Sequence, residues 1–256
     1  MEEMFDQTHG AQYFTKIDLR SGFHQIRLRE EDIEKTAFRT RYGSYEYTVL
    51  PMGISNAPGT FMRLMNETFK DMIDRWVMVF LDDVLVYSRT REEHIKHVRQ
   101  VLDRLRERKL YCKLSKCEFF QREVEFLGHQ LGANGLSVSA DKVKAVREWP
   151  TPKNTTEVRS FLGLAGFYRR FVKDFSKIAM PLTELTHDKK VWEWGEPQKA
   201  AMAALQKALC SAPVLLTPDP TKQFVLNCDA CKYAIGATLQ QDQDQGLNRW
   251  PIDLGS

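Results

Sequence analysis

The sequence has few cysteines and no long apolar run. Its 256 residues include five cysteines at irregular spacing, which argues against a disulfide framework and favours a reducing compartment. No stretch approaches the roughly 20 consecutive apolar residues of a membrane span. The acidic N-terminus has no apolar segment typical of a secretory signal. We therefore expect an intracellular protein with no membrane partner.

An excess of charge of either sign is also missing. The net charge is +3, so the overall charge does not point to a nucleic-acid partner. Its distribution is more informative, because residues 141–177 contain nine Lys or Arg against four acids. A local basic surface of this kind can bind phosphates, although a solvated helix face explains the charge equally well. The chain length allows one or two domains with a sizeable core.

The most informative stretch runs from Val77 to Ser88. Two short apolar, β-branched runs flank the adjacent pair Asp82 and Asp83, which predicts a hairpin with the polar pair at its turn. A single Asp commonly stabilises a turn through its side chain. Two carboxylates held at a strand junction also supply the oxygen ligands that a hard divalent cation prefers.

Asp18 is the candidate for a third carboxylate. It lies near the end of a strand-like segment, residues 13–19, and a helical segment separates it from the hairpin. This order lets the first strand pack beside the hairpin, so that the three carboxylates meet at one edge. Three such groups repel strongly unless cations lie among them. Two Mg²⁺ ions about 3.5–4 Å apart would support an in-line phosphoryl displacement, although unrelated Asp pairs are common.

The remaining pattern predicts a mixture of helices and strands. His94 and His97 share one face of a predicted helix, and a solvated face explains them better than a metal site. The other segments are a hairpin over 36–50, helices over 58–76, 91–109, 139–149, 156–170, 171–186 and 197–210, strand-like pieces over 118–131, and strands over 224–229 and 234–239.

Four blocks of sequence carry a specific resemblance. They are FTKIDLRSGFHQI (14–26), LPMGISNAPGTF (50–61), FLDD (80–83) and FLGH (126–129). In this order and near this spacing they closely resemble the polymerase blocks of reverse transcriptases from gypsy-type LTR retrotransposons, the Metaviridae Pol polyprotein. The resemblance covers essentially the whole chain, and four ordered blocks are much more specific than any one of them.

The resemblance implies an α/β (α+β) fold, a right-hand polymerase. Residues 1–135 would form the palm with partial fingers, residues 136–190 a basic helical thumb, and residues 191–256 the beginning of an RNase H-like domain. We expect the chain to be truncated at both ends, because most of the fingers and the later RNase H carboxylates have no counterpart here. Such an element would reside in a cytoplasmic particle or the nucleus.

The resemblance also implies roles for individual residues. Asp18, Asp82 and Asp83 match the catalytic carboxylates that bind Mg²⁺ or Mn²⁺. Phe23 matches the aromatic residue that excludes a 2′-hydroxyl, and the alternative is an ordinary core Phe. The nucleotide-binding set would be Leu19, Phe23, Met52 and Gly53. The template–primer set would be Asn56, Pro58, Phe126, Leu127, Gly128 and His129. The alternative for residues 53–58 is an ordinary loop into a helix, and the alternative for residues 126–129 is a core hairpin. Asp229 would be the first RNase H carboxylate.

The sequence therefore predicts an RNA-directed DNA polymerase. A primer 3′-hydroxyl would attack a deoxynucleoside triphosphate on an RNA or DNA template–primer duplex. RNA cleavage is not expected. The alternative is a non-catalytic retroelement remnant or a domesticated nucleic-acid-binding protein. A palm-type cyclase or nuclease would not account for Phe23, the loop over 53–58 and the basic helices together.

Overall fold

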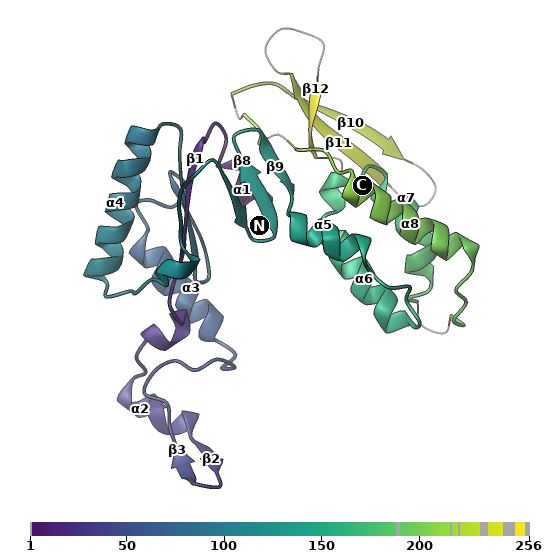
Figure 1. The fold of residues 1–256 in the computed structure, drawn as a ribbon. Coiled ribbons are helices and arrows are strands. Elements are labelled where there is room, and N and C mark those ends of the chain that lie inside the picture. Colours follow the sequence, from purple (N-terminus) through teal and green to yellow (C-terminus); the bar gives the residue numbers. More distant parts are fainter. Residues whose placement is uncertain are drawn as a thin grey trace. The chain divides into compact units, whose positions relative to one another are not determined.

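The computed structural model describes residues 2–187, 190–215, 217–219, 221–230, 235–242 and 249–253. The chain forms two compact units, residues 1–124 and residues 125–256. Both contain helices and strands, as predicted (Figure 1). Within these described ranges, no helix is long and apolar enough to cross a membrane.

A four-stranded antiparallel sheet forms the centre of the first unit. Its strand order is β4-β5-β1-β6, with β1 at Tyr13–Asp18, β4 at Val77–Phe80, β5 at Asp83–Ser88 and β6 at Glu118–Gln121. Strands β4 and β5 form the hairpin predicted from the apolar runs. Strand β1 pairs along the whole length of β5, so the first strand does pack beside the hairpin.

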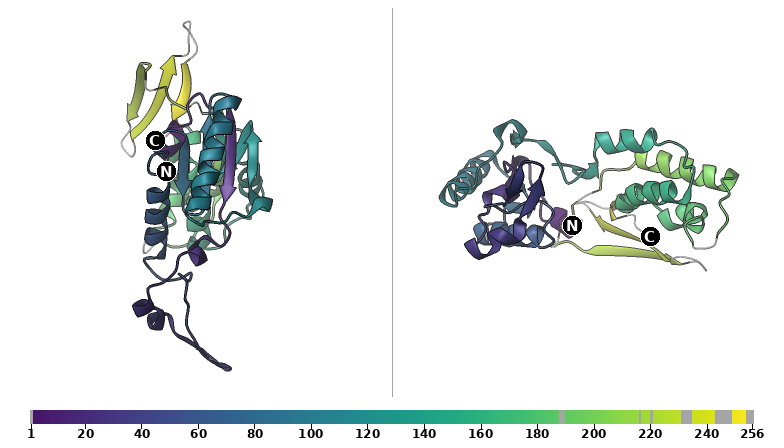
Figure 2. Two further views of the ribbon diagram at one scale, coloured as in Figure 1. Left: turned by 90° about the vertical axis from the view of Figure 1, so that its left-hand side faces the viewer. Right: turned by 90° about the horizontal axis from the view of Figure 1, so that it is seen from below.

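Two helices cover one face of this sheet. They are α3, Ala57–Thr68, and α4, Arg91–Glu107, and Figure 2 shows α4 running alongside the strands. Side chains alternate between the two faces of a strand. Ile17 and Val84 enter the core with both helices, so Asp18 and Asp83 belong to the opposite face. The core cluster consists of Ile17, Leu19, Phe61, Met65, Phe69, Met72, Val77, Val79, Val84, Val86, Val98, Val101, Leu105 and Leu110.

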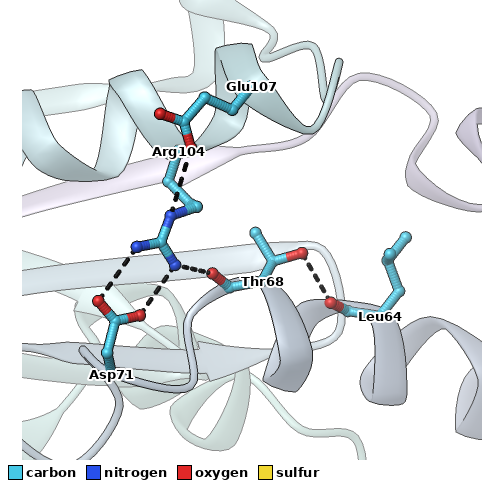
Figure 3. Close-up of polar contacts among 5 residues, drawn as sticks. All are labelled: Leu64, Thr68, Asp71, Arg104 and Glu107. Carbon is cyan, nitrogen blue, oxygen red and sulfur yellow. Dashed lines mark hydrogen bonds and ion pairs between the residues drawn. The ribbon is translucent and has the colours of Figure 1, made fainter.

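Helix α3 ends earlier than its apolar pattern predicts. The pattern continues to Trp76, but the helix ends at Thr68. Figure 3 shows the contact at this end, where Arg104 of α4 donates a hydrogen bond of 2.6 Å to the Thr68 carbonyl oxygen. The same guanidinium binds both carboxylate oxygens of Asp71, at 2.8 and 3.1 Å. Helix termini leave carbonyl groups without intrahelical partners, and the Arg104 guanidinium satisfies one of them.

The prediction that His94 and His97 lie on a solvated face is wrong. His94 is fully buried, and His97 is partly buried and stacks on Trp76 with ring centroids 4.6 Å apart. The helix begins where predicted, because Thr90 and Glu93 form a capping box. The face that carries both histidines lies against the sheet, which the neighbouring acids in the sequence do not reveal.

Short elements complete the first unit. The segment over 36–50 contains the small hairpin β2, Phe38–Thr40, and β3, Gly43–Tyr45, which projects away from the sheet with α2, Glu30–Ile33 (Figure 1). The remaining elements are helix α1 and three 3₁₀ helices. Their bounds are α1 Glu2–Asp6, η1 Gly22–Gln25, η2 Glu34–Thr36 and η3 Leu114–Lys116.

The described residues of the second unit form two small sheets and four α-helices. The first sheet has the order β7-β8-β9, with β7 at Glu123–Phe126, β8 at His129–Gly132 and β9 at Gly135–Val138. The predicted helices are present as α5 Ala140–Arg147, α6 Thr155–Phe167, α7 Phe175–Glu184 and α8 Glu196–Cys210, with the 3₁₀ helix η4 Arg169–Phe171. The second sheet comprises β10 Phe224–Ala230, β11 Ile235–Asp242 and β12 Arg249–Asp253.

Candidate active site

The turn between β4 and β5 carries the first candidate carboxylate. Phe80 pairs with Asp83, so the two turn residues are Leu81 and Asp82 rather than the predicted Asp82 and Asp83. Leu81 has a φ of 52°, in the left-handed region that costs an L-residue about 1–2 kcal/mol. The backbone N–H of Leu19 donates to the Asp82 carbonyl oxygen at 3.1 Å, which ties this turn to the end of β1.

Asp18 and Asp83 lie opposite each other in the sheet. They are direct partners in the antiparallel pairing of β1 and β5. Partner residues in such a pair have Cα atoms about 4.5–5.5 Å apart, so the two carboxylates share one small area. Burial raises the pKa of Asp83, and the charges of Asp82 and Asp18 raise it further, while Lys16 and Lys116 oppose the shift. The three predicted carboxylates therefore influence one another at one end of the sheet.

Asp18 has a cationic partner. The Lys116 ammonium lies 3.3 Å from the Asp18 carboxylate, with 57% of the Lys116 side chain and 16% of the Asp18 side chain exposed. Among the described residues, no three His, Cys, Asp or Glu side chains are gathered closely enough to hold a metal ion. The donor chemistry nevertheless fits a hard divalent cation, because three carboxylate-bearing residues lie at one end of the sheet and the charges of Asp82 and Asp18 already act on Asp83.

Phe23 packs against a core aromatic ring beside these carboxylates. It lies in η1, partly buried, with its ring centroid 5.2 Å from that of the fully buried Phe61 of α3. The preceding Gly22 has no room for a side chain. A Cβ there would lie 2.8 Å from Phe61 Cζ and 3.2 Å from Asp82 Cβ. Gly22 thus lets the Phe23 turn approach both Phe61 and Asp82.

The remaining predicted nucleotide-binding residues lie in different environments. The Leu19 side chain is buried in the core, whereas Met52 is 72% exposed. Gly53 has a φ of 96°, which favours glycine, and open space lies above it. Met52 and Gly53 line a cavity of about 380 Å³ together with Phe38 and Tyr47. Binding of a nucleotide by this set remains a prediction.

Asn56 and Pro58 lie exposed at the start of α3. Asn56 is the N-cap residue, but its side chain makes no capping hydrogen bond. Pro58 occupies the first turn of the helix, where its missing N–H costs nothing. Both are accessible, and their predicted contact with a template or primer remains a prediction.

The residues Phe126 to His129 form the predicted hairpin in the second unit. Phe126 ends β7, His129 begins β8, and both side chains are buried. Burial lowers the pKa of His129 to about 4. Leu127 and Gly128 form the turn, with φ values of 49° and 77°. The four residues therefore fold as one structural unit, and primer contact by them remains a prediction.

Gly128 has a second reason to be glycine. The Tyr168 hydroxyl donates a hydrogen bond of 2.7 Å to the Gly128 carbonyl oxygen, and a Cβ at Gly128 would lie 2.9 Å from the same hydroxyl oxygen. The close approach that glycine permits is made here by Tyr168. This contact lies entirely within the second unit.

Asp229 lies in β10, paired with Gly236 of β11. Its role as a first RNase H carboxylate remains a prediction. Sequence reasoning missed three residues at the sites: Gly22, Lys116 and Tyr168. Gly22 is adjacent to Phe23 in a quoted block, and that adjacency was the available signal. Lys116 and Tyr168 meet their partners only through long-range folding.

Two protein-family models match the chain, one in its first half and one at its C-terminal end. Residues 2–131 match the family described as reverse transcriptase (RNA-dependent DNA polymerase). Residues 194–256 match the RNase H-like domain found in reverse transcriptase. The chain therefore belongs to the reverse transcriptase family.

Similar proteins narrow the position within that family to retrotransposons. The chain is 40% identical over 243 residues to the retrovirus-related Pol polyprotein from transposon 297 of Drosophila melanogaster, covering 94% of this chain and 23% of the relative. It is 40% identical over 250 residues to that of transposon opus, covering 93% and 25%. It is 36% identical over 244 residues to the transposon Tf2-3 polyprotein of Schizosaccharomyces pombe, covering 95% and 18%. The predicted resemblance to an LTR retrotransposon Pol polyprotein is confirmed.

Solved structures agree. A foamy viral protease–reverse transcriptase in complex with double-stranded DNA superposes with a TM-score of 0.88 and 25% identity, covering 99% of this chain and 44% of that one. The same kind of protein in complex with an RNA/DNA hybrid gives a TM-score of 0.83 at 25% identity, covering 98% and 34%. The predicted reverse transcriptase fold is confirmed. The chain spans about a quarter or less of the length of the curated relatives above.

Proposed function

We propose that this chain is the catalytic region of an RNA-directed DNA polymerase, a nucleotidyltransferase encoded by a retrotransposon. The observation that supports this most directly is the pairing of Asp18 with Asp83 next to the Asp82 turn, in a chain of the reverse transcriptase family. This register brings two strands that are distant in the sequence to one carboxylate-bearing edge.

The residues of this edge would divide the work of the reaction. Asp18, Asp82 and Asp83 would hold Mg²⁺, or Mn²⁺ in its place. When bound, the metal supplies activation of the primer 3′-hydroxyl and stabilisation of the leaving oxygen. The β1–β5 pairing holds the carboxylate backbones in position before any ligand arrives, which lowers the entropic cost of orientation.

Substrate recognition would lie beside the carboxylates. Phe23 would occupy the space that a ribonucleotide 2′-hydroxyl needs, supported from below by Phe61. Met52 and Gly53 would line the incoming deoxynucleoside triphosphate. Asn56, Pro58 and the segment 126–129 would contact the template–primer duplex. The foamy viral relatives were solved with double-stranded DNA and with an RNA/DNA hybrid, which supports a duplex as the partner.

A non-catalytic nucleic-acid-binding protein is the alternative. Two observations favour it. The Lys116 ammonium lies against the Asp18 carboxylate that a metal would bind. Among the described residues, no three His, Cys, Asp or Glu side chains are gathered closely enough to hold a metal ion. Such a protein would bind duplex through its basic helices without extending a primer.

A primer-extension assay distinguishes the two functions. The purified chain is given a primed homopolymer RNA template, the complementary deoxynucleotide and Mg²⁺ or Mn²⁺, with the Asp82→Asn variant as the matched control. Incorporation well above this control supports the polymerase. Duplex binding with incorporation no greater than the control would overturn the polymerase and support the alternative.

A further inference from the structure

Lys116, a lysine outside the predicted site, lies against the carboxylate of Asp18. Lys116 ends the 3₁₀ helix η3, and its ammonium is 3.3 Å from the Asp18 carboxylate. We propose that Lys116 is an internal counter-ion that a divalent metal must displace from Asp18, so that this lysine lowers the metal affinity of the site. This inference rests on the proposed function, because it takes Asp18 as a metal ligand.

The backbone holds Lys116 near Asp18. The Lys113 N–H donates to the Asp18 carbonyl oxygen at 2.9 Å, and Cys112 forms a β-bridge with Leu19. The Lys116 N–H in turn donates to the Lys113 carbonyl oxygen at 2.9 Å, which closes the turn that carries the lysine. Two contacts to the end of β1 therefore place this turn, and the ion pair does not depend on a long side chain that happens to reach Asp18.

The positive charge of Lys116 acts on the carboxylates of Asp18 and Asp83 at this edge of the sheet. Asp18, Asp82 and Asp83 lie at one edge, and like charges at this separation repel. The charges of Lys116 and Lys16 act on Asp83 in the opposite direction to those of Asp82 and Asp18. Without a metal, the Lys116 ammonium offsets part of the repulsion among these carboxylates.

The same contact competes with a metal. The Asp18 oxygen that accepts from Lys116 is an oxygen that a cation would coordinate, so metal binding must break or weaken the ion pair. Lys116 can leave, because 57% of its side chain is exposed. A partly exposed pair is worth about 0.2–1 kcal/mol, which corresponds to a factor of up to about five in affinity.

Direct titration with Mn²⁺ tests the proposal without using polymerase activity. Free Mn²⁺ is followed by electron paramagnetic resonance for the wild type, Lys116→Met and Lys113→Met. The Lys113 side chain is exposed on the same turn, so its variant makes the same charge change while it leaves the Lys116–Asp18 ion pair and the Lys113 backbone hydrogen bond in place. We expect Lys116→Met to bind Mn²⁺ about three- to fivefold more tightly than the wild type, and Lys113→Met to stay within about twofold.

Thermal unfolding in a chelator provides a second measurement. The Lys116→Met variant should melt about 2 °C below Lys113→Met without metal, and the difference should disappear at saturating Mn²⁺. A Lys116→Gln variant guards against an effect specific to Met.

The outcomes separate the two claims. If Lys116→Met binds Mn²⁺ no more tightly than Lys113→Met, the counter-ion role is overturned while the metal site stands. If the wild type binds Mn²⁺ no better than Asp82→Asn, the metal site of the proposed function is overturned and this inference with it.

Discussion

His94 Nε2 lies 2.7 Å from the hydroxyl oxygen of Thr15, which joins helix α4 to strand β1 inside the core. The other ring nitrogen, Nδ1, lies 2.9 Å from the Ser88 hydroxyl oxygen. A neutral imidazole has one donor and one acceptor, and both hydroxyl groups can act in either role. Hydrogen bonding alone therefore suits the His94 ring in either protonation state, and it is burial, together with the nearby His97, that lowers its pKa to about 4.

Acid should destabilise the first unit through His94. Its pKa is lower in the folded state than the ordinary value of 6.5, so the unfolded chain binds more protons between these values. The contribution is complete above about pH 6.5 and is lost as the pH falls toward about 4. We expect a loss on the order of 1–2 kcal/mol in the free energy of unfolding between pH 7 and pH 5, measured by urea unfolding.

His94→Asn should flatten this pH dependence. The variant is less stable at pH 7, but its stability should change less between pH 7 and pH 5. His24→Asn, which replaces an exposed histidine, should keep the wild-type slope. An unchanged slope in His94→Asn would show that other groups cause the acid sensitivity.

Removing the Arg104 side chain should loosen the end of α3. Arg104→Met loses the bonds to the Thr68 carbonyl and to Asp71, and hydrogen bonds to charged groups contribute about 1.5–3 kcal/mol when they are well formed. Because Asp71 is 60% exposed, we expect a loss of about 1–2 kcal/mol in chemical unfolding. The matched control is Arg106→Met, whose exposed pair with Asp103 should contribute less than about 0.5 kcal/mol. Equal losses in the two variants would contradict the special position of Arg104.

A single methyl group at Gly22 should disturb the candidate active site. In Gly22→Ala the new Cβ would meet Phe61 and Asp82, and overpacking of this kind typically costs about 1–3 kcal/mol. A small displacement of reacting groups lowers the rate strongly. We therefore expect primer extension to fall by at least about tenfold. Gly59→Ala in α3 has open space around it and should stay within about twofold of the wild type in rate. Wild-type activity in Gly22→Ala would show that the close packing is not needed.

Phe23 is expected to select deoxynucleotides. Phe23→Ala removes the ring that packs on Phe61 and opens space beside the sugar. The ratio of kcat/KM for deoxynucleotides to that for ribonucleotides should fall by about tenfold or more, because the steric penalty disappears. Steady-state primer extension with each nucleotide measures it. An equal loss for both nucleotides would indicate a core residue with no role in selection.

Gly128 and Tyr168 should be energetically coupled. Gly128→Ala brings a Cβ to 2.9 Å from the Tyr168 hydroxyl oxygen, and should destabilise the second unit by about 1–3 kcal/mol. Tyr168→Phe loses one hydrogen bond, worth about 1 kcal/mol. In the double variant the clash with the hydroxyl is absent, so the combined loss should be smaller than the sum. Additive losses in urea unfolding would show that the φ of 77° at Gly128, and not Tyr168, makes alanine unfavourable.

Local features of the fold could be predicted from the sequence. Helix α4 begins at Arg91, as predicted, and the apolar runs around Asp82 form the predicted strands. These features depend on interactions within a few residues, so periodicity and capping reveal them. The four ordered blocks likewise predicted the family that the comparisons confirm.

Other features were decided only by the tertiary structure. The turn lies at Leu81 and Asp82 because strand pairing, which extends over Asp18 and Asp83, sets the register. Helix α3 ends early at a residue that Arg104 contacts from a distant helix.

The sequence by itself predicted the hairpin around Asp82, the main helices in their order and the family. The tertiary structure decided that His94 is buried, that Gly128 makes room for Tyr168, and that Lys116 lies against Asp18. The physical reason is distance along the chain. Lys116 and Asp18 are 98 residues apart, so no local pattern contains information about their contact. Only the pairing and packing of the whole unit bring their opposite charges together.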